Sequence, residues 1–182
     1  MNIFEAFEKR YSHKEAFLPE AVPLADLEKI AKAGIEAPSG GNTQSVRLVI
    51  LPDRAALAPV CEASPTIGLE TAPAAIAVLT DKTVISPVGF SFEKEDYAAA
   101  VENMLLAATA IGYSSLWLDS PYFDPEKEKK ARAVLSAPDT YRLWAVLPVG
   151  KPKGDGSRRE KMPFESRVSY GKFGSGKPGG AK

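Results

Sequence analysis

The stretch that decides the fold is EKEDYAAAVENMLLAATAIG, residues 93–112. Three acidic residues in its first turn favour a helix N-terminus, and neither glycine nor proline interrupts it before Gly112. Apolar side chains cover much of the circumference of this predicted helix. They are Ala98, Ala99, Val101, Met104, Leu105, Ala108 and Ile111. Such a helix must be buried on more than one side, either in a monomer core or at an interface between two chains.

Three apolar runs around this helix indicate strands that are buried in a sheet. They are residues 46–51, 74–80 and 142–150, and a shorter strand is predicted at residues 115–118. Apolar residues at helical spacing predict further helices. These are residues 3–8, 24–37, 53–62 and 125–135. Pro38 ends the second of these helices, and residues 9–20, 39–42 and 81–92 are predicted to be irregular.

The length of 182 residues suits a single domain, which we place at residues 1–170, followed by a flexible tail rich in glycine and lysine at residues 171–182. The lone Cys61 excludes a disulfide framework within the chain and fits a reducing compartment. No apolar stretch approaches the ~20 residues of a membrane span, and the first residues do not resemble a signal peptide. We therefore expect a cytoplasmic protein that does not enter a membrane.

Charge is distributed unevenly although the net charge is zero. Residues 1–150 contain 14 Lys or Arg and 20 Asp or Glu, whereas the C-terminal arm, residues 151–182, contains 9 and 3. A basic arm on an acidic body could bind a phosphate, a nucleic acid or an acidic partner. The arm lacks the interleaved aromatic and basic residues of nucleic-acid binders, so we expect no nucleic-acid partner.

Several kinds of catalytic site are excluded by the residues that the chain lacks. His13 is the only histidine and Cys61 the only cysteine, so zinc sites built from these residue types are absent. The sequence has no GxSxG nucleophile motif, no phosphate-binding P-loop and no dinucleotide-binding GxGxxG between a strand and a helix. An enzyme with so little acid–base and metal chemistry would take its reactivity from a cofactor.

Three polar clusters stand out in the remaining sequence. They are Arg10-Tyr11-Ser12-His13-Lys14, the loop Ala37-Pro38-Ser39-Gly40-Gly41-Asn42-Thr43-Gln44, and Arg158-Arg159-Glu160-Lys161. In the first, alternate side chains of an extended segment share a face, so two cations and a hydroxyl can point at one anion. In the second, glycine allows close backbone approach while Ser, Asn and Gln offer directed hydrogen bonds. Each cluster alone is more often ordinary surface.

Taken in order, these motifs resemble the nitroreductase family of FMN-dependent enzymes. Arg10, Ser12 and Lys14 match its motif Arg-x-Ser-x-Arg/Lys, and residues 37–44 match Ala-Pro-Ser with a nearby Asn and Gln. A long helix containing Asn103 then leads into Gly-x-x-Ser-x-Trp at residues 112–117. Further along are Gly-x-Pro at residues 150–152 and a basic pair, Arg159 and Lys161, before Pro-x-Glu at residues 163–165. The resemblance spans about residues 4–170.

The resemblance implies an α+β fold with a central mixed or antiparallel β-sheet flanked by helices. It implies a homodimer in which C-terminal arms are exchanged and the long helix lies at the dimer core. It implies FMN as the cofactor and NADH or NADPH as the electron donor. The acceptor would be a small electron-poor molecule such as a nitroaromatic compound or a quinone, and the flavin N5, not a protein side chain, would carry the chemistry.

The resemblance also assigns cofactor contacts and no metal ligands. Arg10, Arg159 and Lys161 would hold the FMN phosphate, with Ser12 beside it, while Lys14 would supply a cation near the N1/O2 edge of the ring. Asn42 and Ser39 would contact the ring from the partner subunit, and residues 118–120 would face its N5 edge. The full predicted set is Arg10, Tyr11, Ser12, Lys14, Pro38, Ser39, Asn42, Gln44, Leu118, Asp119, Ser120, Arg159 and Lys161.

Two other classes of function stay open at this point. A flavin-binding sensor or storage protein would hold FMN but turn over little NADH or NADPH. A non-catalytic dimeric interaction protein would use the basic arm to bind an acidic partner and would be colourless. The sequence does not choose between NADH and NADPH and does not identify the acceptor.

Overall fold

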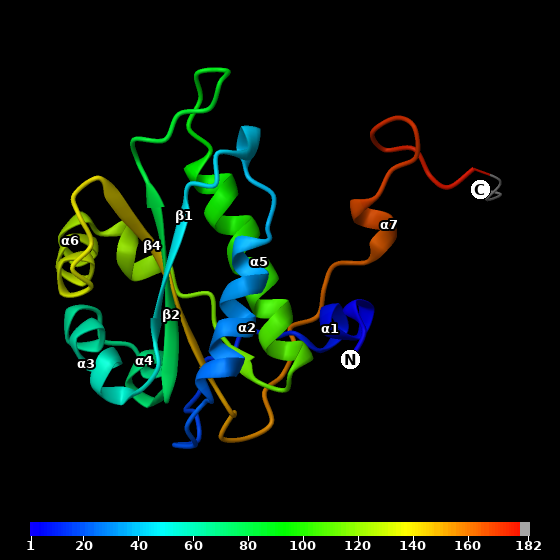
Figure 1. Ribbon diagram of the computed structural model, residues 1–182. Coiled ribbons are helices and arrows are strands. Elements are labelled where there is room, and N and C mark those ends of the chain that lie inside the picture. Colours follow the sequence, from blue (N-terminus) through cyan, green and yellow to red (C-terminus); the bar gives the residue numbers. More distant parts are fainter. Residues whose placement is uncertain (179–182) are drawn as a thin grey trace.

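The computed structural model describes residues 1–178 and has a four-stranded antiparallel sheet as its middle layer (Figure 1). The strands are β1 (Val46–Leu51), β2 (Ala74–Asp81), β3 (Ser114–Ser115) and β4 (Tyr141–Gly150), in the order β1-β2-β4-β3. All three strand pairs are antiparallel. The predicted α+β class is confirmed, and of the two sheet types predicted, the antiparallel one is found.

Helices cover both faces of this sheet (Figure 1). On one face lie α2 (Leu24–Ile35) and α5 (Glu93–Ala110); on the other lie α3 (Arg54–Ala63), α4 (Ile67–Thr71) and α6 (Pro125–Val134). Along β2 the side chains alternate between the two layers: Ile76 and Val78 belong to the core beneath α2 and α5, and Ala77 to the core on the other face. Because both faces are covered, β2 and β4 are apolar at successive positions and do not show a polar alternation.

The long helix α5 is buried within a single chain. It packs on the sheet, on α2 and on α1 (Ile3–Lys9), and Val101 and Met104 are fully buried. Asn103 strengthens the contact with α2 by donating from Nδ2 to the Ala33 carbonyl at 3.0 Å. The apolar circumference of this helix is therefore accounted for largely by the monomer core.

Local signals explain where several helices begin. Asn2 forms a capping box with Glu5 at the start of α1. Asp53 caps α3 and Asp124 caps α6, each accepting hydrogen bonds from backbone N–H groups of the first turn. The short helices α4 and α7 (Phe164–Arg167) were not predicted.

The short strand predicted at residues 115–118 is confirmed in part, but its bounds are wrong. The observed strand β3 has only Ser114 and Ser115, which pair with Gly150 and Val149 of β4. Leu118 forms only an isolated bridge to Val146. Residues 116 and 117 belong to no strand, and the apolar side chains of Leu116, Trp117 and Leu118 pack in or against the core without extending the ladder.

After β4 the chain leaves the body as the C-terminal arm, which carries α7 and projects away from the sheet (Figure 1). The arm exposes large apolar side chains, among them Phe164 and Phe173. In the predicted tail, residues 171–178 contain no helix or strand, and residues 179–182 lie outside the described residues. Within residues 1–178, no helix is both long enough and apolar enough to span a membrane.

Candidate functional site

The first predicted cluster forms an extended segment beside β3. The His13 backbone N–H donates to the Ser115 carbonyl at 3.0 Å, and the hydroxyls of Tyr11 and Ser114 are 3.0 Å apart. These contacts fix the side-chain directions: Ser12 and Lys14 are exposed while His13 is buried. The segment thus presents its cationic and hydroxyl side chains outward, in the arrangement expected for binding an anion.

A cavity of about 340 Å³ lies where this segment meets the C-terminal arm. Its lining combines the first and third predicted clusters. The lining residues are Arg10, Tyr11, Ser12, His13, Lys14, Glu15, Gly156, Ser157, Arg158, Arg159 and Lys161. Five of them are Lys or Arg, so the cavity is strongly positive. The fold therefore brings together two basic segments that are about 145 residues apart in the sequence.

Two contacts hold the walls of this cavity. Arg10 approaches Glu102 of α5, with 3.5 Å between Arg10 Nε and Glu102 Oε1. Arg158 of the arm donates from Nη1 to the Glu8 carbonyl at 3.0 Å. Gly156 lies directly against the ring of Tyr11, because a Cβ at position 156 would be 1.9 Å from a ring carbon. A side chain at position 156 would therefore require the arm or the Tyr11 ring to move.

His13 contributes a buried polar atom that sequence reasoning missed. Its ring packs against Phe17 at a centroid distance of 4.5 Å. Its Nε2 is 3.0 Å from the Ala16 carbonyl, which can only accept, so Nε2 carries the proton and Nδ1 is a hydrogen-bond acceptor. Nδ1 is buried and has no partner among the described residues. His13 is also one of the residues that line the cavity.

The second predicted cluster lies elsewhere, at the other end of the molecule near the start of α5 (Figure 1). It contains a short 3₁₀ turn, η1 (Gly40–Asn42), in which Asn42 is exposed. Ser39 accepts a hydrogen bond at Oγ from the Gln44 backbone N–H at 2.9 Å. No residue of this loop lines the basic cavity.

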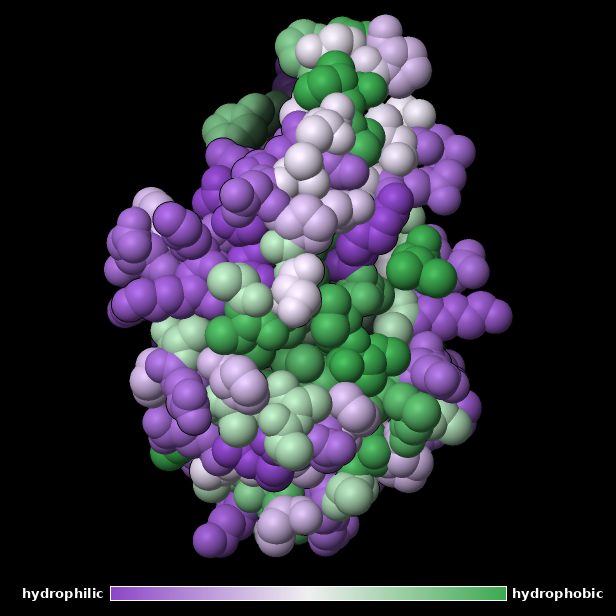
Figure 2. Space-filling model, turned by 60° about the vertical axis from the view of Figure 1, so that its left-hand side comes forward, coloured by the Kyte–Doolittle hydropathy of each residue, from purple (hydrophilic) through white to green (hydrophobic). Residues whose placement is uncertain are grey.

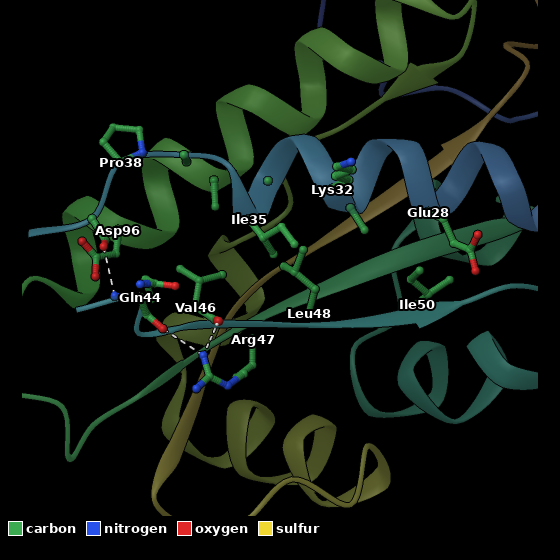
Figure 3. A pocket seen from close by; sticks show the side chains of 15 residues that line it. Glu28, Lys32, Ile35, Pro38, Gln44, Val46, Arg47, Leu48, Ile50 and Asp96 are labelled. Carbon is green, nitrogen blue, oxygen red and sulfur yellow. Dashed lines mark hydrogen bonds between the residues drawn. The ribbon is translucent and has the colours of Figure 1, made fainter. Parts of the chain in front are cut away.

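This loop instead borders a second, larger groove of about 610 Å³ between α2 and the edge strand β1. Figure 3 shows Gln44 and Asp96 at one end of the groove and Glu28 at the other, with Ile35 and Leu48 between them. Pro38 and Ser39 also line it. Hydrophobic side chains gather across the middle of the surface that Figure 2 displays. Most residues that line the groove are apolar, among them Val46 and Ile50, so the groove is mainly apolar, in contrast to the first cavity.

The predicted residues Leu118, Asp119 and Ser120 line neither of these two cavities. Leu118 is buried in the hydrophobic core, whereas Ser120 is exposed at the start of the 3₁₀ turn η2 (Ser120–Phe123). Burial raises the pKa of Tyr97, and the Asp119 carboxylate adds to this shift, which indicates that Asp119 lies toward Tyr97.

An aromatic group lies next to this segment. The rings of Tyr97 and Trp144 are stacked at 4.7 Å, and Trp117 meets Tyr97 edge-on at 5.9 Å. Trp144 also donates from Nε1 to Thr80 at 2.7 Å. These contacts join α5, β2, β4 and the segment after β3, and so fix the course of residues 117–120 past the sheet.

Comparison with known proteins connects these features to a family. The sequence model of the nitroreductase family matches residues 7–68 and 62–151. A protein of Archaeoglobus fulgidus, named as a candidate NADH dehydrogenase/NAD(P)H nitroreductase, is 38% identical over 132 residues, which cover 71% of this chain and 74% of that protein.

Solved structures agree with this match. A Bacteroides thetaiotaomicron protein named as a candidate NADH dehydrogenase/NAD(P)H nitroreductase superimposes with a TM-score of 0.81 at 25% identity, covering 94% of this chain and 98% of that one. A candidate nitroreductase of Desulfovibrio desulfuricans in complex with FMN gives a TM-score of 0.74 at 25% identity, covering 95% and 98%. This chain belongs to the nitroreductase family.

Proposed function

We propose that this protein is an FMN-dependent oxidoreductase that passes electrons from NADH or NADPH to an electron-poor acceptor such as a nitroaromatic compound or a quinone. The observation that carries the proposal is the basic cavity between residues 10–14 and the C-terminal arm. It is supported by membership of the nitroreductase family and by the FMN complex of the Desulfovibrio desulfuricans relative. In this proposal residues 1–170 act as one FMN-binding domain.

The residues of the cavity fit a phosphate monoester joined to a polyhydroxyl chain. Arg10, Arg159 and Lys161 would neutralise the phosphate, because cationic donors form strong hydrogen bonds to phosphate oxygens. The exposed hydroxyl of Ser12 can exchange hydrogen bonds with the hydroxyls of the ligand. A volume of about 340 Å³ is near the lower end of the range for ligand pockets, so the flavin ring would extend out of it.

The remaining residues would orient the cofactor and adjust its charge. Lys14 is exposed beside the cavity, where its ammonium group would stabilise negative charge at the N1/O2 edge of the ring. Residues 118–120 would face the N5 edge, with Ser120 exposed and available to do so. When bound, the flavin supplies hydride acceptance and donation, and the protein supplies binding and orientation.

We further propose that the site is completed by a second copy of the chain. Ser39 lines the apolar groove, and neither Ser39 nor Asn42 lines the basic cavity, so these predicted ring contacts would come from the partner subunit. The arm exposes Phe164 and Phe173, and β1 leaves one edge of the sheet unpaired beside the apolar groove. Exchange of arms between two copies would cover both surfaces.

An absorbance spectrum of the purified protein, followed by addition of NADH and then NADPH without oxygen, tests the proposal. We expect flavin bands that bleach with at least one nucleotide and return when a quinone or nitroaromatic acceptor is added. Bands that persist with both nucleotides would favour the sensor or storage alternative. A colourless protein that also fails to take up added FMN would contradict the proposal and favour the interaction-protein alternative.

A further inference from the structure

A buried carboxylate at the start of α5 has no role in the site described so far. Asp96 is only 2% exposed, yet no Lys, Arg or His among the described residues forms a salt bridge with it. Its partners are three donors of the loop that follows α2. Oδ1 accepts from the Gly40 backbone N–H at 2.8 Å, and Oδ2 accepts from the hydroxyls of Ser45 at 2.6 Å and Thr43 at 3.4 Å.

The position of Asp96 explains how a buried charge is tolerated there. It lies in the first turn of α5, where free backbone N–H groups and the helix dipole favour negative charge. Three hydrogen bonds then replace the water that the carboxylate has lost. The 2.6 Å contact with Ser45 is in the range of a short charge-assisted bond.

The loop that Asp96 holds has an unfavourable backbone. Gly41, Asn42 and Gln44 have φ angles of +60°, +55° and +50°. Glycine adopts such angles freely, but Asn and Gln do so at a cost in free energy. Two left-handed non-glycine residues in three positions therefore need support from outside the loop, and Asp96 bonds to residues on both sides of them.

A close approach at Gly40 makes this support possible. A Cβ at position 40 would lie 2.1 Å from Cγ of Phe92, so only glycine can bring its N–H this near to the start of α5. Gly41 in turn lies against Pro87 and Ser86 of the next loop. The result is an exposed Asn42 whose side chain makes one weak contact, at 3.5 Å to Gln44 Nε2.

We propose that Asp96 is a positioning residue that holds residues 39–45 in the conformation needed to contact the flavin bound by the partner subunit. It acts through Gly40, Thr43 and Ser45 and does not itself touch the cofactor. This role rests on the proposed function, in which Asn42 and Ser39 supply ring contacts. A loop fixed before binding loses little conformational entropy when the ligand arrives, so Asp96 raises flavin affinity.

Asp96→Asn tests the proposal in the full-length protein. The amide keeps the volume, but the Nδ2 that replaces Oδ2 can only donate, so the Ser45 and Thr43 hydroxyls can no longer donate to it. The negative charge that strengthens all three bonds is lost as well. We expect amide hydrogen exchange of residues 40–45 to rise at least about tenfold and FMN affinity to fall at least about tenfold. Ser45→Ala, which removes one donor and leaves the charge in place, should change both quantities in the same direction by less.

Asp26→Asn is the matched control. Asp26 also lies in the first turn of a helix and accepts a hydrogen bond from a hydroxyl, that of Tyr113 at 2.9 Å. It is at the N-terminal end of α2, whereas the loop of residues 39–45 follows the C-terminal end. This variant should leave the exchange of residues 40–45 unchanged. Should Asp96→Asn fail to fold, the Ser45→Ala variant carries the same two measurements.

The outcomes separate this inference from the proposed function. Failure of the wild-type protein to bind FMN would overturn the proposed function and the positioning role together. Wild-type binding with equal FMN affinity in Asp96→Asn would overturn the positioning role alone. Faster exchange of the loop without loss of FMN affinity would reduce Asp96 to a purely structural residue and would also overturn the proposal.

Discussion

Replacing Arg10 by alanine is expected to weaken FMN binding by about 10- to 140-fold. Arg10 lines the basic cavity and forms an ion pair with Glu102 at 3.5 Å. A hydrogen bond to a charged group contributes about 1.5–3 kcal/mol, and each 1.4 kcal/mol corresponds to a factor of ten in affinity. The Glu102 side chain is 42% exposed, so loss of this ion pair should cost the fold less than about 1 kcal/mol.

Fluorescence titration of the apoprotein with FMN and with riboflavin measures this effect and locates it. Riboflavin lacks the phosphate, so its affinity should be nearly the same in the wild type and in Arg10→Ala. Lys130→Ala on α6, across the sheet from α5, controls for the loss of one positive charge. Equal weakening of FMN and riboflavin, or unchanged FMN affinity, would refute the assignment of Arg10 to the phosphate.

Two further changes test the arm. Gly156→Ala should push the arm away from Tyr11, because the new Cβ would lie 1.9 Å from the ring. FMN affinity, measured by the same titration, should fall while thermal stability changes little. Equal FMN affinity would show that the arm does not form a wall of the site. Deleting residues 155–182 should lower both flavin affinity and dimer stability, because it removes Arg158, Arg159 and Lys161 together with Phe164. Dimer stability is measured by analytical ultracentrifugation. A truncated protein that remains a yellow dimer would contradict arm exchange.

Much of the fold could be predicted because long elements carry strong local signals. The strand predicted at residues 46–51 coincides with β1, since five of its six residues are apolar and the run is followed by Pro52. The helix predicted at residues 53–62 corresponds to α3, which begins and ends one residue later. Asp53 is the N-cap of this helix and not part of its first turn. By contrast, α4 has only five residues and is too short to show a helical period in its apolar residues. Of these residues, Leu69 is buried and Ile67 is exposed.

The candidate site could be predicted only in part. The sequence motifs indicate which residues belong to it, but they do not show which side chains are buried or which residues they contact. With Ser12 and Lys14 outward, alternation already required His13 to face inward, so the signal for its burial was present in the sequence and was missed. Asp96 carried no distinguishing signal, because an acidic residue in the first turn of a helix is ordinary. Its role depends on Gly40, which is 56 residues away in the sequence.

The order of motifs along a chain does not say which of them share a site in one molecule. Residues 10–14 line one cavity together with Arg158, Arg159 and Lys161. Ser39 and Gln44 line another, next to the first turn of α5. Since α5 has 18 residues, it spans about 27 Å, and Arg10 meets it at Glu102, well beyond Asp96. If the second set contacts the flavin from another chain, as proposed, cofactor binding stabilises the dimer by mass action. Flavin affinity should accordingly depend on protein concentration, a linkage that a site within one chain would not produce.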